Sequence, residues 1–464
     1  MTRPAGTIDL GELPHGERPE TPTAWPVLLR LRYRYGWRSI GRVAGAAAAV
    51  LLALLTVTAA AGPTRPVLEP HLALPAVLSY AHDQQHLYVI EAVEPDPIRI
   101  AAYRLDSGAL EWATPQSIGE FAWLLRWDEV LLVHTYQDNG SVVWALDPDS
   151  GQELWRLPGN HSLDTIAGGQ FVFSASQPGL TLRGDEPPVH QLTGVDPAAG
   201  DPVWNAEVPG WKYAFGVLES TYLVAYGPDS DLTSYDLTTG ERLASAPIQT
   251  TDSTDVHVVG SLVVLTDHSQ LPPVLTAYDA VTLTPQWTYS HRDSLDMWPS
   301  GCGELVCLIG AAPPRALDPA SGELVWSADW ASLAGGGLTL VSDLAAAGLA
   351  GHLLLTEQPR QHSWLIDAAT GQPVLDLGSW WLPQQWPEPV AAGELPLLLR
   401  PGTIAAPTVA GRLLPDLSGV RLLGAIDTPL QSDCSTGTGY VFCVTGPAAS
   451  ENPQQLVVWR DRLA

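Results

Sequence analysis

Two aspartates beside a glycine are the first residues in the chain whose types and spacing suggest chemistry. Asp147 and Asp149 lie between Trp144 and Trp155 and are followed by Gly151. Paired carboxylates can hold a cation or exchange protons with a substrate. They also suit a tight turn, where a carboxylate accepts hydrogen bonds from backbone N–H groups and glycine adopts a positive φ. Because the same segment recurs along the chain, we interpret these aspartates as turn residues.

Other motifs for catalysis or metal binding are missing from the sequence. The 12 histidines show neither H-x-H nor H-E-x-x-H spacing, so a zinc site has no support. Residues 137–140 and 227–231 are rich in oxygen ligands but lack a twelve-residue calcium loop with its terminal glutamate. There is no G-x-S-x-G and no phosphate-binding glycine loop. We therefore predict no catalytic residue, no metal ligand and no cofactor.

The four cysteines form two close pairs, Cys302 with Cys307 and Cys434 with Cys443. Four cysteines permit three connectivities. Pairing by proximity is the simplest, and two local disulfides would require an oxidising compartment. The alternative is four buried free thiols in a reduced, cytosolic protein.

The segment around Gly151 is one of eight imperfect copies of a strand–turn–strand unit. The turn positions are 39 to 49 residues apart, which is the period of a four-stranded propeller blade. An apolar strand precedes each turn, and helical periodicity is absent. The eight positions are Gly108, Gly151, Gly200, Gly240, Leu283, Gly322, Gly371 and Gly419.

These units predict an all-β fold, a propeller of about eight four-stranded blades. The sequence after the last turn is long enough for three strands, and residues 66–75 could add a fourth strand that closes the ring. Nine blades are therefore the alternative. Closure of the ring would pair the terminal edge strands, which otherwise favour aggregation. We assign residues 77–464 to the propeller and residues 63–76 to a linker or closing strand.

The repeated pattern Ala-x-Asp-x-x-Thr/Ser-Gly-x-x-x-Trp resembles the repeat of the PQQ-like (pyrroloquinoline-quinone-type) β-propellers over nearly all of residues 77–464. The resemblance implies that tryptophans dock between neighbouring blades; in this sequence they are Trp112, Trp155, Trp204, Trp287 and Trp326. Enzymes of this fold bind a quinone and calcium, and many carry a disulfide between adjacent cysteines. This chain has no Cys-Cys dipeptide, and no catalytic residue carries over from the resemblance.

The N-terminal region predicts a membrane anchor. Residues 1–39 form a disordered, basic tail, and residues 40–62 include an uncharged run long enough to cross a bilayer as one helix. Arginines precede this run, which predicts a cytoplasmic N-terminus and an extracytoplasmic propeller. Small residues at Ala59–Ala61 support the alternative of a cleaved signal peptide.

Charge is distributed unevenly between the two parts. Residues 1–42 carry seven arginines and four acidic residues, so the remainder carries 23 − 7 = 16 basic and 50 − 4 = 46 acidic residues. A part with a net charge of −30 repels phosphate backbones, which disfavours nucleic-acid binding.

One interruption of the repeat is a candidate for partner binding. Trp380, Trp381 and Trp386 lie close together among prolines, and tryptophan is enriched at binding hot spots. We therefore expect a non-catalytic, membrane-tethered scaffold or sensor that binds an envelope protein or peptide. The alternative is a membrane-bound quinoprotein dehydrogenase that oxidises alcohols or sugars.

Overall fold

The computed structural model describes the chain from residue 70 to residue 460, with gaps. The described residues are 70–92, 98–115, 121–137, 140–157, 159–175, 189–209, 212–215, 221–226, 231–248, 250–251, 253–290, 297–310, 313–328, 338–343, 349, 351–358, 362–382, 395–400, 407–426, 430–437, 439–445 and 454–460. The chain divides into a unit Met1–Arg65 and a unit Pro66–Ala464, and all described residues belong to the second. The predicted tail and membrane span lie outside them. Within the described part, no helix is long and apolar enough to cross a membrane.

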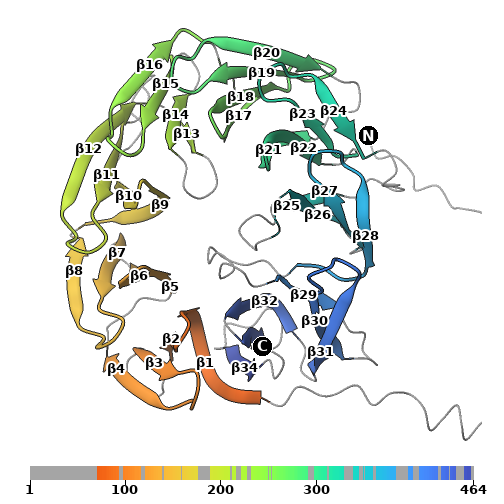
Figure 1. Ribbon diagram of the computed structural model, residues 1–464. Helices are drawn as coiled ribbons and strands as arrows, with labels where there is room; N and C mark the ends of the chain where they lie inside the picture. Colours follow the sequence, from red (N-terminus) through yellow and green to blue (C-terminus); the bar gives the residue numbers. More distant parts are fainter. Residues whose placement is uncertain are drawn as a thin grey trace, which may run out of the picture. The chain divides into compact units, whose positions relative to one another are not determined.

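The described strands form antiparallel sheets arranged as a ring (Figure 1). Six of these sheets have four strands each, and in each of them the chain runs from the innermost strand to the outermost. Their strands are β5 (Phe121–Trp127), β6 (Val130–Gln137), β7 (Gly140–Leu146), β8 (Glu153–Leu157); β9 (His161–Ala167), β10 (Gln170–Ala175), β11 (Val189–Val195), β12 (Pro202–Pro209); β13 (Lys212–Phe215), β14 (Tyr222–Tyr226), β15 (Leu232–Asp236), β16 (Arg242–Ala246); β17 (Thr254–Val259), β18 (Leu262–Asp267), β19 (Val274–Asp279), β20 (Pro285–Ser290); β21 (Met297–Cys302), β22 (Leu305–Gly310), β23 (Arg315–Leu317), β24 (Leu324–Ser327); β25 (Leu338–Asp343), β26 (His352–Gln358), β27 (His362–Asp367), β28 (Pro373–Gly378).

The remaining strands form a three-stranded and a seven-stranded sheet. These strands are β29 (Leu397–Arg400), β30 (Thr408–Leu413), β31 (Val420–Ile426); and β32 (Leu430–Gly437), β33 (Tyr440–Thr445), β34 (Gln454–Arg460), β1 (Pro70–His82), β2 (His86–Glu91), β3 (Arg99–Arg104), β4 (Leu110–Pro115). The three-stranded sheet gains a further partner from Trp381, which forms an antiparallel bridge with Leu399.

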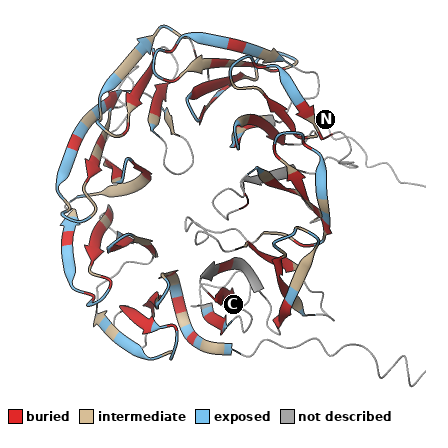
Figure 2. Ribbon diagram, viewed as in Figure 1, coloured by how far each residue is buried: buried red, intermediate tan, exposed pale blue. Residues whose placement is uncertain are grey.

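The core of the propeller lies between successive sheets. The second and third strands of a sheet are apolar on both faces because a neighbouring sheet covers each face. On β6, for example, Leu131, Leu132 and Val133 are fully buried, and β10 buries Phe171 and Phe173 in the same way. Figure 2 shows this burial on the middle strands of the sheets, whereas outermost strands such as β8 and β12 are largely exposed.

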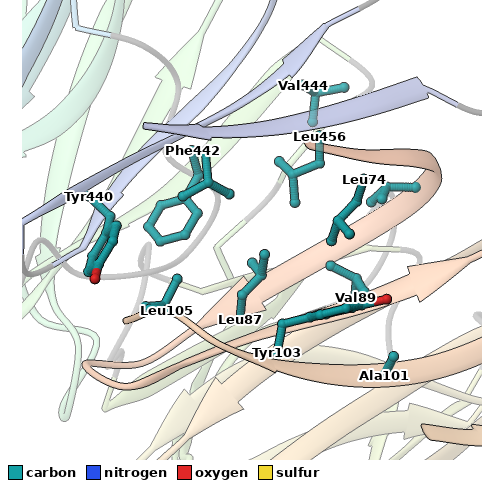
Figure 3. Packing of buried hydrophobic residues seen from close by; sticks show 12 residues of the cluster. Leu74, Leu87, Val89, Ala101, Tyr103, Leu105, Tyr440, Phe442, Val444 and Leu456 are labelled. Carbon is teal, nitrogen blue, oxygen red and sulfur yellow. The ribbon is translucent and has the colours of Figure 1, made fainter. Parts of the chain in front are cut away.

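Strand β1 closes the ring by belonging to two blades. Its first part pairs with β34, with Leu72 opposite Val458, and its second part pairs with β2. The strand bends between these parts at Ala76, whose φ is 61°. Side chains from the N-terminal and the C-terminal strands of the propeller pack in one cluster, which includes Leu74, Leu87, Phe442 and Leu456 (Figure 3).

The shared strand also settles the blade count among the described residues. The seven-stranded sheet holds two four-strand blades that have β1 in common, so the eight sheets make nine blade units. The predicted all-β propeller is confirmed. The described residues form nine blades, which is the alternative that a ring-closing strand made possible.

Candidate binding site

The repeated aspartates are turn residues in the structure. The Oδ1 atom of Asp147 accepts hydrogen bonds from the backbone N of Asp149 at 3.1 Å and of Ser150 at 2.8 Å. The Ser150 hydroxyl donates to the same oxygen at 2.8 Å. Equivalent bonds from Ser321 hold the pKa of Asp318 below its usual value. These carboxylates are therefore occupied by their own turns.

The five repeat tryptophans each lie against the turn of the next blade. Trp155 donates through Nε1 to the Pro197 carbonyl at 2.7 Å, and its ring covers Gly200, where an added Cβ would lie 2.3 Å from Trp155 Cγ. Trp112, Trp287 and Trp326 make the same Nε1 bond to the next blade at 2.8 Å. Trp204 covers Gly240 alike, but its Nε1 has no hydrogen-bond partner among the described residues. Glycine is required here because it leaves room for the ring.

Two blade contacts replace the tryptophan–glycine pair by a smaller residue and a leucine. Where the tryptophan is Ala244, the glycine position of the next turn holds Leu283, which is buried in the same cluster. In the last turn Leu417 has the positive φ, rather than Gly419 as the repeat predicts, and Leu375 packs against the same cluster as Leu417. Both turn leucines have a positive φ, at 54° and 56°. The leucine side chain thus fills the volume that the missing indole leaves.

Both predicted local disulfides are present, and the described residues contain no free cysteine. Cys302 on β21 bonds to Cys307 on β22, and Cys434 on β32 bonds to Cys443 on β33. Each disulfide therefore ties the innermost strand of a blade to its second strand. All four cysteines are buried.

The candidate partner-binding tryptophans differ in their exposure. Trp380 is 8% exposed, and its ring packs on Gly411 beneath the guanidinium of Arg400. This burial gives Trp380 a packing role within the blade contact. Trp381 is partly buried, and its backbone N and O both bond to Leu399. Trp386 lies outside the described residues, so partner binding by Trp381 and Trp386 stays a prediction.

The two ends of the blades differ in their connections. At one end several blades join their first two strands by a two-residue turn, such as 128–129 or 168–169. The opposite end, which we call the loop end, carries the connections between second and third strands and between blades. These range from residues 138–139 to residues 176–188. Variable loops on a rigid scaffold are the usual place for binding residues.

Aromatic side chains gather at the loop end of β5 and β6. The ring of His134 stacks on Trp123 at 5.0 Å and meets the ring of Tyr136 edge-on at 4.7 Å. Burial lowers the pKa of His134, so the imidazole is neutral near pH 7. Tyr136 is 47% exposed, and exposed aromatic side chains are common at binding hot spots.

An aspartate that lies outside the turn positions occupies the neighbouring blade contact. Asp164 is the extra residue of a β-bulge in β9, because Thr165 pairs with Val172 and Leu163 with Phe173. The Ser174 hydroxyl donates to its Oδ1 and the Tyr213 hydroxyl, from β13 of the next blade, donates to its Oδ2, both at 3.0 Å. Bulges commonly re-aim a side chain near a functional site.

The surroundings of Asp164 disfavour its charged form. Burial raises the pKa of Asp164 to about 6, and the two hydroxyl donors only partly oppose this effect. Buried Glu91, in contrast, has Arg99 Nε at 2.7 Å. No basic side chain forms an ion pair with Asp164 among the residues that the structure describes. The sequence signal for this site was weak: an aspartate inside a strand, away from any turn glycine.

Metal-binding side chains do not cluster in the part of the chain that the structure describes. No group of three or more His, Cys, Asp or Glu side chains gathers there in a way that could hold a metal ion. The partners of Asp164 are two hydroxyl groups rather than further acidic side chains. The geometry instead provides hydrogen-bond acceptors and aromatic faces at the loop end.

Comparison with known proteins finds one family-model match and several similar solved structures. A PQQ-type family model, described as outer membrane protein assembly factor BamB, matches residues 189–301. The solved structure of BamB from Moraxella catarrhalis is 13% identical, with 86% of this chain and 99% of that chain covered and a TM-score of 0.39. A europium-containing methanol dehydrogenase is 13% identical over 85% and 93%, with a TM-score of 0.36.

A eukaryotic initiation factor is similar at a TM-score of 0.56, with 10% identity over 82% of this chain and 94% of that chain. At this identity the likeness shows the fold alone. No curated protein sequence matches the chain.

Proposed function

We propose that this chain, which is a PQQ-like β-propeller protein, is a non-catalytic scaffold that binds another protein outside the cytoplasm while its N-terminal segment anchors it in the membrane. The family model that matches residues 189–301 describes an assembly factor of outer membrane proteins, and this supports a protein-binding role. The partner we expect is an envelope protein or peptide.

The observation that carries the location is the pair of disulfides. Cys302–Cys307 and Cys434–Cys443 each join the first two strands of a blade, and structural disulfides persist in oxidising compartments. This supports an extracytoplasmic propeller, and the arginine-flanked apolar run at residues 40–62 supports a tether with the N-terminus inside.

The proposed binding role follows from which side chains are engaged in the scaffold and which remain available to a partner. The turn aspartates and docking tryptophans are engaged within and between blades, so they build the scaffold. Tyr136, exposed at the loop end, and Asp164, partly buried in the middle of β9, are left to face a partner.

Alkylation in intact cells tests the location. Full-length protein should resist a thiol reagent until it is unfolded and reduced, after which four cysteines become modified. A membrane-impermeant protease should digest the propeller in cells whose outer permeability barrier is removed. Modification of free thiols in freshly unfolded, unreduced protein, or protection of the propeller from protease, would contradict the proposal.

Replacement of Trp381 and Trp386 by alanine tests the predicted contribution of that segment. Partner capture by in-cell crosslinking should fall while the protein stays folded. Unchanged capture would remove these two tryptophans from the binding surface.

A quinoprotein dehydrogenase is the alternative function. Addition of pyrroloquinoline quinone and calcium to the purified protein, followed by dye reduction with an alcohol or a sugar, distinguishes the two. We expect no dye reduction above that of a heat-unfolded sample.

A further inference from the structure

Asp164 holds an incompletely used carboxylate at the contact between two blades. A carboxylate has about four acceptor positions, and the Ser174 and Tyr213 hydroxyls use one on each oxygen. The side chain belongs to the innermost strand of its sheet and is only partly buried. Among the described residues no further side chain donates to these oxygens, so the remaining acceptor positions can take a donor from a ligand.

An ionised carboxylate at position 164 is unfavourable for the stability of the fold. An asparagine would accept hydroxyl bonds without a charge, and a charge that is buried without a cation disfavours folding. The carboxylate of buried Glu91 has such a cation in Arg99, and partly buried Asp83 has Arg126 at 3.5 Å. Sites that break the local rules of packing are commonly functional.

The side chains around Asp164 suit a cationic group with a flat face. Tyr213 stacks with Phe215 at 6.1 Å and meets the ring of His190 edge-on at 4.8 Å. A guanidinium can pair with a carboxylate through two N–H groups and stack on an aromatic ring at the same time. The net charge of −30 over residues 43–464 attracts basic segments from a distance.

We propose that Asp164 is the anchor for an arginine side chain that a basic segment of the bound protein inserts between the blades β9–β12 and β13–β16, from the loop end of β9 and β13. This inference rests on the proposed scaffold function and specifies the chemistry of its partner. The arginine would supply a cation that the described residues around Asp164 do not supply, and Tyr213 would support its guanidinium.

A peptide probe tests this site without knowledge of the partner. Binding of the fluorescein-labelled peptide Gly-Arg-Gly-Arg-Gly to the full-length protein is measured by anisotropy at low salt. We expect Asp164→Asn to weaken binding at least tenfold. The matched control, Asp376→Asn, removes the same charge from exposed strand β28 and should change binding less than twofold. A citrulline version of the peptide, which has the same shape without the charge, should bind no better to wild type than to Asp164→Asn.

Equal binding by wild type and Asp164→Asn, or equal effects of the two variants, would overturn the proposal. Thermal melts confirm that each variant is folded, and Tyr213→Phe, which removes one hydroxyl, should weaken binding by a smaller factor. Failure of the peptide experiment leaves partner capture in cells unaffected. Conversely, loss of capture in cells would reject the scaffold function while the peptide result still decides whether Asp164 binds arginine.

Discussion

The contact between Trp155 and Gly200 offers the sharpest test of how neighbouring blades are held together. In the change Gly200→Ala, the new Cβ would lie 2.3 Å from Trp155 Cγ and 2.6 Å from Trp155 Cβ. These atoms sit at the base of the side chain, so the indole has to leave its position. Trp155 is 9% exposed, and it would also lose its hydrogen bond to the Pro197 carbonyl.

The expected loss of unfolding free energy combines two effects. A non-glycine residue at the Gly200 φ of +73° costs about 1–2 kcal/mol. Loss of a docked tryptophan costs about 3–5 kcal/mol by analogy with truncation of buried aromatic residues. The total is about 4–7 kcal/mol, a large fraction of the stability of an ordinary domain.

Gly169 provides the matched control for the backbone effect. Its φ is +76°, nearly the same, but no described atom lies within 4 Å of an added Cβ. Gly169→Ala should therefore cost only about 1–2 kcal/mol. Urea unfolding of both variants, followed by circular dichroism, measures the difference. Equal midpoints for the two variants would refute the role of the tryptophan–glycine contact.

Three further predictions concern charge, packing and redox state. Because burial raises the pKa of Asp164 to about 6 from 3.8, the folded chain binds this proton more tightly, and stability is lost as pH rises from about 4 to about 6. Asp164→Asn should remove this loss of unfolding free energy, which amounts to about 3 kcal/mol above pH 6. The urea midpoint of the wild type should therefore fall more than that of Asp164→Asn between pH 4 and 7.5, and equal falls would contradict this prediction. Ala244→Trp and Leu283→Gly should each destabilise the chain, whereas the double variant restores the tryptophan–glycine pair and should cost at least about 1 kcal/mol less than the sum; additive losses would argue against the volume exchange. Replacement of Cys302 and Cys307 by alanine should cost about 2 kcal/mol for so short a loop, and reducing agent should then shift the urea midpoint less than it shifts that of the wild type.

The fold was predictable because its signal is repeated. Asp147, Gly151 and Trp155 recur at blade spacing, and each copy independently indicates the same turn and the same anchor. The close cysteine pairs were equally readable, since their short separation favours local bonds. The sequence predicts residues 66–75 as a possible ring-closing strand, and the pairing of β1 with β34 confirms this closure.

The candidate site was not predictable because its residues occur once and do not recur with the repeat. Asp164 meets Tyr213 only because two innermost strands are neighbours, 49 residues apart in sequence. Exposure was equally hidden: Trp380 lies in the same aromatic segment as Trp381, yet it packs inside the blade contact. A single sequence shows which residues repeat but not which of the others come together.

Site-specific photo-crosslinking in living cells tests the central proposal, a protein-binding scaffold that uses its loop end. A photoreactive amino acid replaces Tyr136, at the loop end of β6, or Leu154, on outer strand β8; the two side chains are similarly exposed, at 47% and 45%. We predict a discrete adduct with an envelope protein from position 136 and none from position 154. Adducts of equal yield at both positions, or no adduct at either, would contradict the account.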